Sequence, residues 1–151
     1  MGQNNSIKVV IADDHPVVRI GIKYHLGLAP GISIVGEAAN GLEAIQLVKE
    51  LSPDVLIVDL RMPLLDGVQV LARLHTEMPG LFILVISEDD DACQPKDTLA
   101  MGASGHFLKS QDPRSLIKAV RQAAGGEEQS LPPNQLLSQK ADWDRGPLSF
   151  A

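Results

Sequence analysis

Five short apolar segments recur along the chain and alternate with longer segments of helical spacing. The apolar segments are IKVVIA (7–12), ISIVGEA (32–38), VLIVD (55–59), FILVIS (82–87) and GHFLK (105–109). Between them, apolar residues recur three to four positions apart, as at Val68, Leu71 and Leu74. Strands that are apolar on both faces and separated by helices are typical of a parallel sheet with helices on two sides. The sequence therefore predicts an α/β fold with a doubly wound, five-stranded parallel sheet.

Polar residues at the expected helix starts agree with this alternation. Asn40, Asp66 and Asp112 each precede a helical segment, and each can accept hydrogen bonds from the first backbone N–H groups of that helix. Pro113 follows Asp112 and suits the first helical position. We expect helices to begin directly after these three residues.

The segment behind the fourth strand is less regular. It reads EDDDACQPKDTLAMG from Glu88 onward, with four consecutive acidic residues and a proline. Proline fits the first turn of a helix but breaks its interior. We therefore expect a fourth helix that is short, late or mobile and that begins near Pro95.

Composition limits the classes of function. With 151 residues and 44% hydrophobic content, the chain can build one domain with a core. Its 19 acidic and 13 basic residues give a net charge of −6, which argues against binding the nucleic-acid backbone and favours a cationic partner. The single Cys93 suits a reducing compartment, so we expect the cytoplasm. We expect no membrane association, since no apolar run approaches the roughly 18–20 residues of a membrane span.

Polar residues follow four of the five predicted strands. Asp13 and Asp14 follow the first strand, Asp59 ends the third, Ser87 ends the fourth and Lys109 ends the fifth. The carboxyl ends of parallel strands meet at one edge of a sheet, and ligands bind there where the strand order reverses. In the flavodoxin-like order 2-1-3-4-5, this crevice brings the three aspartates together.

Three neighbouring carboxylates repel one another unless a cation lies among them. Their oxygen atoms suit Mg²⁺, which is usually held by carboxylates together with phosphate oxygens. Asp59 could then attack phosphorus as a nucleophile, with Lys109 and the Ser87 hydroxyl contacting the phosphoryl oxygens. The sequence therefore predicts a magnesium-dependent phosphoryl acceptor. Asp59 lies at the end of a buried strand because a nucleophile must be held rigidly in place.

At these residues the chain resembles the receiver domain of bacterial two-component response regulators, over residues 7–125. The phosphoacceptor motif of that family is present as Asp59, Met62-Pro63 and Gly67, and the acidic pair, hydroxyl and lysine are present at the positions named above. The stretches DDHPVVRIGI and GASGHFLK are most similar to the NarL/FixJ-like subclass, whose output is a LuxR-type helix-turn-helix domain.

The resemblance implies a signalling function. Asp59 would be phosphorylated by a sensor histidine kinase, and Mg²⁺ would be held by Asp13, Asp14, Asp59 and the backbone carbonyl of Arg61. Such a domain catalyses its own modification and turns over no external substrate, so it is not an enzyme in the usual sense. It would form a homodimer on activation and control a DNA-binding transcriptional output.

The chain divides into two parts by composition. Residues 1–126 are expected to form the receiver domain, and residues 127–151 are expected to be a linker or a docking tail that includes Trp143 and Phe150. No helix-turn-helix segment is present, so we expect the chain to stop before the output domain and to contact DNA only through that missing part.

Four histidines remain to be interpreted. The family usually places Tyr or Phe where this chain has His106, as the ring that turns inward when the phosphoryl group contacts the hydroxyl. We hypothesise that His106 takes this switching role with Ser87, with some pH sensitivity because its ordinary pKa lies at about 6.5. The alternative is an exposed His106 that does not switch. His15, His25 and His75 are interpreted as surface or helix-face residues.

The sequence also bears on three other functions. A magnesium-dependent phosphohydrolase typically needs a second aspartate two residues beyond the nucleophile, and this chain has Arg61 there. A nucleotide-binding protein needs a glycine-rich loop after the first strand, which is absent. An atypical receiver that acts as a phosphorylation-independent interaction module stays open, because of the acidic run and Pro95.

Overall fold

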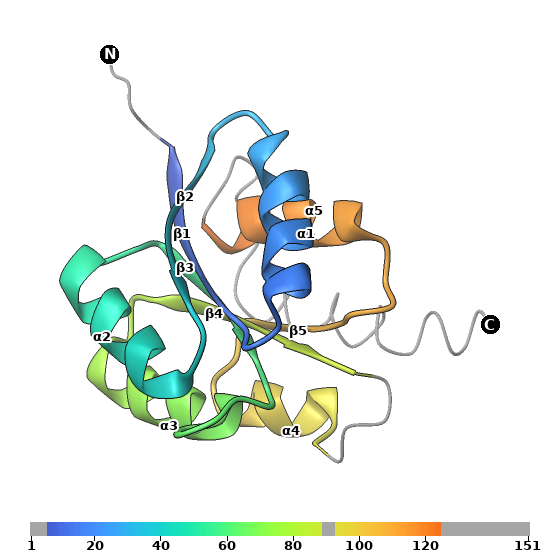
Figure 1. Ribbon diagram of the computed structural model, residues 1–151. Helices are drawn as coiled ribbons and strands as arrows, with labels where there is room; N and C mark the ends of the chain where they lie inside the picture. Colours follow the sequence, from blue (N-terminus) through green and yellow to red (C-terminus); the bar gives the residue numbers. More distant parts are fainter. Residues whose placement is uncertain (1–5, 89–92, 125–151) are drawn as a thin grey trace.

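The computed structural model describes residues 6–88 and 93–124, in which five strands and five helices alternate (Figure 1). The elements are β1 (Ile7–Ala12), α1 (Pro16–Gly27), β2 (Ile32–Ala38), α2 (Gly41–Leu51), β3 (Val55–Asp59), α3 (Gly67–Glu77), β4 (Phe82–Ser87), α4 (Pro95–Ala100), β5 (Gly105–Leu108) and α5 (Pro113–Ala123). The alternation expected from the sequence is confirmed.

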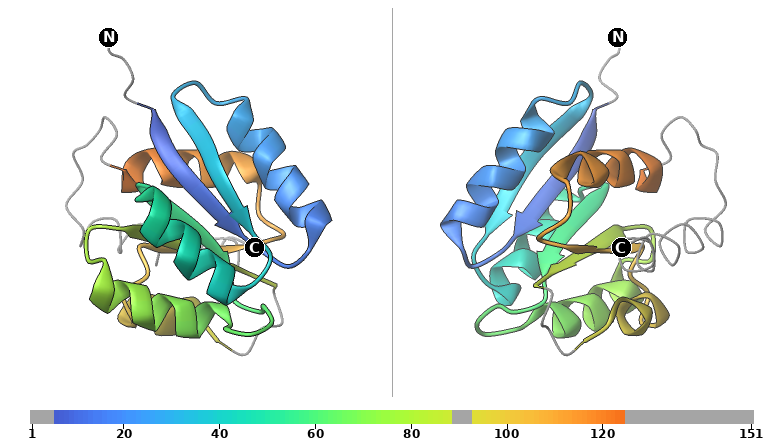
Figure 2. Two further views of the ribbon diagram at one scale, coloured as in Figure 1. Left: turned by 60° about the vertical axis from the view of Figure 1, so that its left-hand side comes forward. Right: turned by 90° about the vertical axis from the view of Figure 1, so that its right-hand side faces the viewer.

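The strands form one parallel sheet in the order β2-β1-β3-β4-β5, which confirms the predicted flavodoxin-like topology. Helices α1 and α5 cover one face, and helices α2, α3 and α4 cover the other (Figures 1 and 2). The central strand β3 has a neighbour on each side, and all five of its residues are buried. Its last residue, Asp59, is therefore held by the most enclosed strand of the molecule.

The core consists of two hydrophobic layers, one on each face of the sheet. Leu56 points into the layer under α2 and α3, and its neighbour Ile57 points into the layer under α1 and α5. This follows from the geometry of a strand, in which successive side chains point to opposite faces. Burying one such side chain contributes roughly 1.5–3 kcal/mol to stability, so the strand ends that carry polar residues are rigidly placed.

The predicted helix caps are present. The Asn40 side chain accepts a hydrogen bond from the N–H of Glu43, at 2.8 Å. Asp66 accepts one from the N–H of Gln69 at 2.9 Å, and the Gln69 side chain accepts one in return. Asp112 caps α5 in the same way.

Helix α4 is short, as the sequence predicts. It begins at Pro95 and is six residues long, whereas α2, α3 and α5 have eleven residues each. The acidic residues at positions 89–91, and the expected boundary between residues 126 and 127, lie outside the described part of the chain. Within residues 6–88 and 93–124, no helix is both long and apolar enough to cross a membrane.

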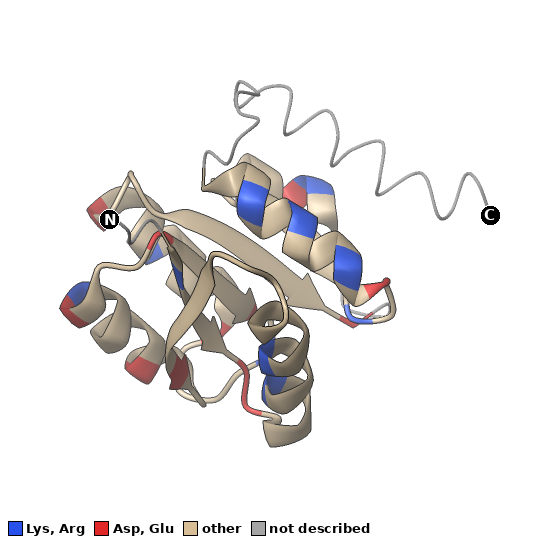
Figure 3. Ribbon diagram, turned by 90° about the horizontal axis from the view of Figure 1, so that it is seen from above, with Lys and Arg blue, Asp and Glu red and all other residues tan. Residues whose placement is uncertain are grey.

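The five strands carry very little charge, and most charged residues lie on helices and loops (Figure 3). The charged residues within the strands are Lys8, Glu37 and Asp59. Lys8 is exposed and Glu37 is half-buried, while only 1% of the surface of Asp59 is exposed. Burying a carboxylate without a charged or hydrogen-bonding partner is unfavourable, so Asp59 needs such partners in the folded protein.

Candidate functional site

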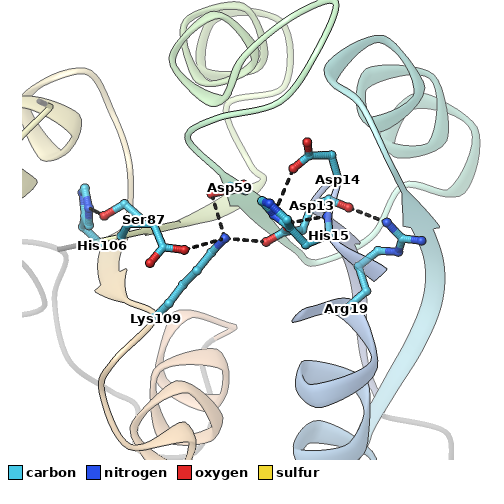
Figure 4. Close-up of polar contacts among 9 residues, drawn as sticks. Asp13, Asp14, His15, Arg19, Asp59, Ser87, His106 and Lys109 are labelled. Atoms are coloured by element: carbon cyan, nitrogen blue, oxygen red, sulfur yellow. Dashed lines mark hydrogen bonds and ion pairs between the residues drawn. The ribbon is translucent and has the colours of Figure 1, made fainter. Parts of the chain in front are cut away.

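The carboxyl ends of β1, β3, β4 and β5 meet at one edge of the sheet and bring the predicted polar residues together (Figure 4). The Lys109 ammonium lies 3.1 Å from Oδ2 of Asp13 and 3.4 Å from Oδ1 of Asp59. It also lies 3.6 Å from Oε2 of Glu88, which follows β4. The backbone N–H of Lys109 donates to the Ser87 carbonyl at 2.8 Å, which fixes this lysine directly after β5.

The acidic pair lies in the turn between β1 and α1. Asp13 is fully buried, and its N–H donates to the carbonyl of Ala38 at 3.0 Å. The Arg19 guanidinium donates to the Asp13 carbonyl at 2.5 Å and to the Glu37 carboxylate at 3.2 Å. Sequence reasoning missed Arg19, because a basic residue inside a helix gives no sign of reaching back to the preceding turn. These contacts hold the turn in the conformation that points Asp13 at Lys109.

The electrostatic environment of Asp59 differs from that of a surface carboxylate. Burial and the nearby charge of Asp13 raise the pKa of Asp59 to about 6, against the opposing effects of Lys109 and of the hydrogen bond from the Arg61 backbone N–H. Burial alone would lower the pKa of Lys109, but Asp13 and Asp59 outweigh it, and the pKa is raised. At neutral pH the site therefore holds an ionised Asp59 beside a protonated Lys109.

Gly67 allows α3 to begin directly behind Asp59. A Cβ atom at position 67 would lie 2.3 Å from the Asp59 carbonyl oxygen and 2.7 Å from Cα of Leu60. Real Cβ atoms do not approach other atoms this closely, so only glycine fits without a shift of the backbone. Its N–H donates to the Leu60 carbonyl at 2.9 Å. The glycine eight residues after Asp59 is thus explained by close packing.

The carboxylates form a cluster that could hold a cation. Within the described residues, one buried oxygen on each of Asp13, Asp14 and Asp59 accepts no hydrogen bond, although Lys109 and His15 lie within ion-pair distance of two of them. Potential ligand atoms of these aspartates and of His15 all lie within 4.8 Å of one another, so the group could hold a metal ion. Carboxylate oxygens are the ligands that a hard divalent cation prefers, so this donor set fits Mg²⁺.

His15 is a surface residue, as the sequence predicts, and it also contacts the acidic pair. Its side chain is 58% exposed, in keeping with a surface residue, but Nδ1 lies 3.0 Å from Oδ1 of Asp13 and 3.1 Å from Oδ1 of Asp14. The histidine therefore belongs to the acidic cluster. Its place directly after the aspartate pair was the available signal, but only the fold of the turn shows that the ring bends back. His25 and His75 lie in the last turns of α1 and α3, at the far ends of these helices from the site.

His106 is buried and faces Ser87. Only 1% of its surface is exposed, and Nε2 lies 2.6 Å from Oγ of Ser87 (Figure 4). The expected alternative of an exposed ring is therefore wrong. Rotation of His106 on phosphorylation stays a prediction, as does the role of the Arg61 carbonyl as a metal ligand. Sequence reasoning also missed Thr98, which lies 2.7 Å from the other ring nitrogen of His106.

Comparison with known proteins gives a consistent result. Residues 9–121 match the family described as response regulator receiver domain. The nitrate/nitrite response regulator protein NarL of Escherichia coli K12 is 37% identical over 127 residues, which cover 84% of this chain and 59% of that protein. The chain thus spans little more than half the length of the curated relatives it matches.

Solved structures agree with the sequence comparison. The signal receiver domain of the response regulator NarL from Mycobacterium tuberculosis superimposes with a TM-score of 0.76 at 36% identity, covering 82% of this chain and all of that one. RcsB from Salmonella enterica serovar Typhimurium, solved on a promoter with a phosphomimetic, superimposes with a TM-score of 0.73 at 30% identity. That match covers 95% of this chain and 70% of RcsB.

Proposed function

Because this chain belongs to the response regulator receiver domain family, we propose that it is a phosphoacceptor signalling domain, in which Asp59 receives a phosphoryl group from a sensor histidine kinase. The observation that carries the proposal is the placement of a buried carboxylate at the end of the central strand, 3.4 Å from the ammonium of Lys109. A nucleophile held this rigidly does not lose orientational freedom in the reaction.

The transfer would proceed by direct displacement. An oxygen of the Asp59 carboxylate forms a bond to phosphorus, while the bond from phosphorus to the donor histidine nitrogen breaks and leaves its electron pair on that nitrogen. Above its pKa of about 6, Asp59 is ionised and able to attack. Lys109 neutralises charge on one phosphoryl oxygen, and the Ser87 hydroxyl donates a hydrogen bond to another.

The acidic cluster would hold the required cation. Asp13, Asp14, Asp59 and the backbone carbonyl of Arg61 are the proposed ligands of Mg²⁺, which supplies positive charge beside the transferred phosphoryl group. Calorimetric titration with Mg²⁺ tests these ligands. We expect Asp14→Asn to weaken binding at least tenfold, and Asp54→Asn, an exposed aspartate before β3, to leave it unchanged. Equal affinities for both variants would contradict the assignment.

We further propose that residues 1–126 form the receiver unit and residues 127–151 a linker to a DNA-binding output domain. NarL of Escherichia coli is described as a nitrate/nitrite response regulator protein, and RcsB was solved bound to a promoter in the presence of a phosphomimetic. By this analogy, the whole protein is a cytoplasmic transcription regulator that forms a homodimer on activation and turns over no external substrate. Sedimentation of the chain with and without beryllofluoride, which mimics an aspartyl phosphate, should show a dimer only in the complex.

Phosphorylation itself is tested by mass. The chain is incubated with Mg²⁺ and a small phosphodonor, and the mass of one phosphoryl group is expected on the wild type and on Asp54→Asn, but not on Asp59→Asn. A wild type that gains no phosphoryl group would reject the proposal. In that case the phosphorylation-independent interaction module becomes the better interpretation.

A further inference from the structure

A buried chain of hydrogen bonds runs from the end of β4 to the first turn of α4. Ser87 Oγ lies 2.6 Å from Nε2 of His106, and Nδ1 of the same ring lies 2.7 Å from Oγ1 of Thr98. The Thr98 hydroxyl donates in turn to the backbone carbonyl of Pro95, at 3.1 Å. All three residues are buried, with at most 1% of their surface exposed.

The direction of these hydrogen bonds follows from counting protons. A hydroxyl group has one proton to donate, and Thr98 gives it to the Pro95 carbonyl, which can only accept. When the Thr98 hydroxyl gives its proton to the Pro95 carbonyl, Oγ1 accepts from Nδ1 of His106, and the ring proton then lies on Nδ1. A buried imidazole is favoured in its neutral form, so Nε2 is bare and accepts the proton of Ser87.

This arrangement conflicts with the proposed phosphorylated state. Ser87 follows Ile86, the residue paired with Asp59 across the sheet, and its hydroxyl is expected to donate to a phosphoryl oxygen. Phosphoryl oxygens only accept hydrogen bonds, and Ser87 cannot give its one proton both to them and to Nε2. If Ser87 turned away while the ring stayed as it is, the buried Nε2 atom would lose its hydrogen bond from Ser87, which is unfavourable.

We propose that His106 resolves this conflict by changing tautomer, so that its proton lies on Nδ1 in the unmodified domain and on Nε2 in the phosphorylated one. This inference rests on the proposed phosphorylation of Asp59. In the second state Ser87 donates to the phosphoryl group and accepts from Nε2–H, while Thr98 turns its proton from the Pro95 carbonyl to Nδ1. One proton leaves Nδ1 to solvent and one arrives from solvent at Nε2, so the ring stays neutral.

The change reaches α4 through Thr98. Once Thr98 donates to His106, the Pro95 carbonyl loses its side-chain donor in the first turn of a six-residue helix. His106 is thus a positioning residue that connects the phosphoryl site with α4. A tyrosine ring has one polar atom and a phenylalanine ring has none, so neither could make both contacts.

Nitrogen NMR of the histidine rings tests the proposal, with the resonances of His106 assigned by their loss in His106→Gln. In the free chain we expect a protonated Nδ1 and a bare Nε2, and with Mg²⁺ and beryllofluoride the reverse. A free chain with the proton on Nε2 overturns the proposal. The proposal is also overturned if the ring is unchanged or doubly protonated in the complex, provided that the Asp59 resonances show that beryllofluoride is bound.

A second variant tests the chain of bonds without any phosphorylation. Thr98→Val keeps the shape but removes the acceptor for Nδ1–H, so the free variant should carry the ring proton on Nε2, where it can donate to Ser87. Thr76→Val, on the exposed part of α3, should leave the ring of His106 unchanged. If free Thr98→Val keeps the ring proton of His106 on Nδ1, the proposed change of tautomer is overturned. If beryllofluoride does not bind at all, the proposed function fails instead. The tautomer of the free chain does not depend on beryllofluoride, so the two failures can be told apart.

Discussion

The Lys109 ammonium lies 3.4 Å from Oδ1 of Asp59 and at the same time 3.1 Å from Oδ2 of Asp13. One positive charge thus faces two buried carboxylates, and Asp14 adds a third acidic group close by. The lysine compensates only part of this charge, so the site keeps a preference for a further cation. The same imbalance makes the stability of the domain depend on pH and on single substitutions at the site.

Removing Lys109 should destabilise the domain. In Lys109→Met, both buried carboxylates lose their cationic partner, and breaking a buried ion pair costs about 3–5 kcal/mol. We expect the free energy of unfolding in urea to fall by about 2–4 kcal/mol at pH 7.5 without divalent cations, and by less at pH 5, where Asp59 is largely protonated. Lys49→Met is the matched control, since the pair of Lys49 with Glu77 lies at the surface and is screened by solvent. Equal losses in the two variants would contradict this account of the site.

Asp59→Asn should stabilise the metal-free domain in a pH-dependent way. The pKa of Asp59 is about 6 in the folded state, against 3.8 for the free side chain, so the fold favours the protonated form. The folded state binds more protons than the unfolded one between these values, and stability therefore falls as pH rises from about 4 to about 6. Asparagine does not titrate and escapes this loss.

Urea unfolding at two pH values measures the effect. We expect the advantage of Asp59→Asn over the wild type to be about 1 kcal/mol larger at pH 7.5 than at pH 5, from the linkage between protonation and stability. Saturating Mg²⁺ should reduce the advantage at pH 7.5, because it binds the wild type more tightly. An advantage that is the same at both pH values would show that Asp59 has an ordinary pKa.

Gly67→Ala should destabilise the domain and disturb the site. The added Cβ would overlap the backbone of Asp59 and Leu60, and overpacking of this kind costs about 1–3 kcal/mol. Gly21→Ala, within α1, is the matched control, since its Cβ would meet nothing within 4 Å and alanine favours helices. Thermal unfolding should therefore show a lower Tm for the first variant and an unchanged or higher Tm for the second.

The backbone of α4 should open more easily than that of the other helices. Helices this short are marginal without strong packing, and α4 has only six residues. We expect the Met101 amide, which bonds to the Asp97 carbonyl, to exchange with deuterium at least tenfold faster than the Val48 amide in α2. Similar protection of the two amides would mean that α4 is as firmly held as its longer neighbours.

Much of the fold could be predicted because the strands are short, apolar and separated by helical segments. The predicted runs 7–12, 32–38, 55–59 and 82–87 coincide with β1 to β4, and β5 ends one residue before Lys109. The convergence of Asp13, Asp59 and Lys109 followed from one rule, that parallel strands end at the same edge. The strand positions depend on local sequence and the convergence of the site residues depends on topology, and each can be recognised from the pattern of apolar and polar residues.

The contacts that could not be predicted depend on how side chains turn after the fold is complete. His15 bends back onto the acids beside it, Arg19 reaches from α1 to the turn before it, and Thr98 meets His106 from α4. Each contact joins residues whose types are common on helix surfaces and in turns. The burial of His106 could not be predicted either, since the sequence does not show that the hydroxyl groups of Ser87 and Thr98 contact its two ring nitrogens.

Because α4 is short, little free energy is needed to change the shape of the surface that it forms. In a helix of fewer than two turns, most backbone carbonyl and amide groups are terminal, so few internal bonds resist a small shift or unwinding. A longer helix would keep its position after the loss of one contact at its first turn, because its other backbone hydrogen bonds would hold it. In α4, a change in the hydrogen-bond partner of Thr98 alone could move the whole helix. A protein bound to the α4 surface could then respond to phosphorylation without any movement of the sheet.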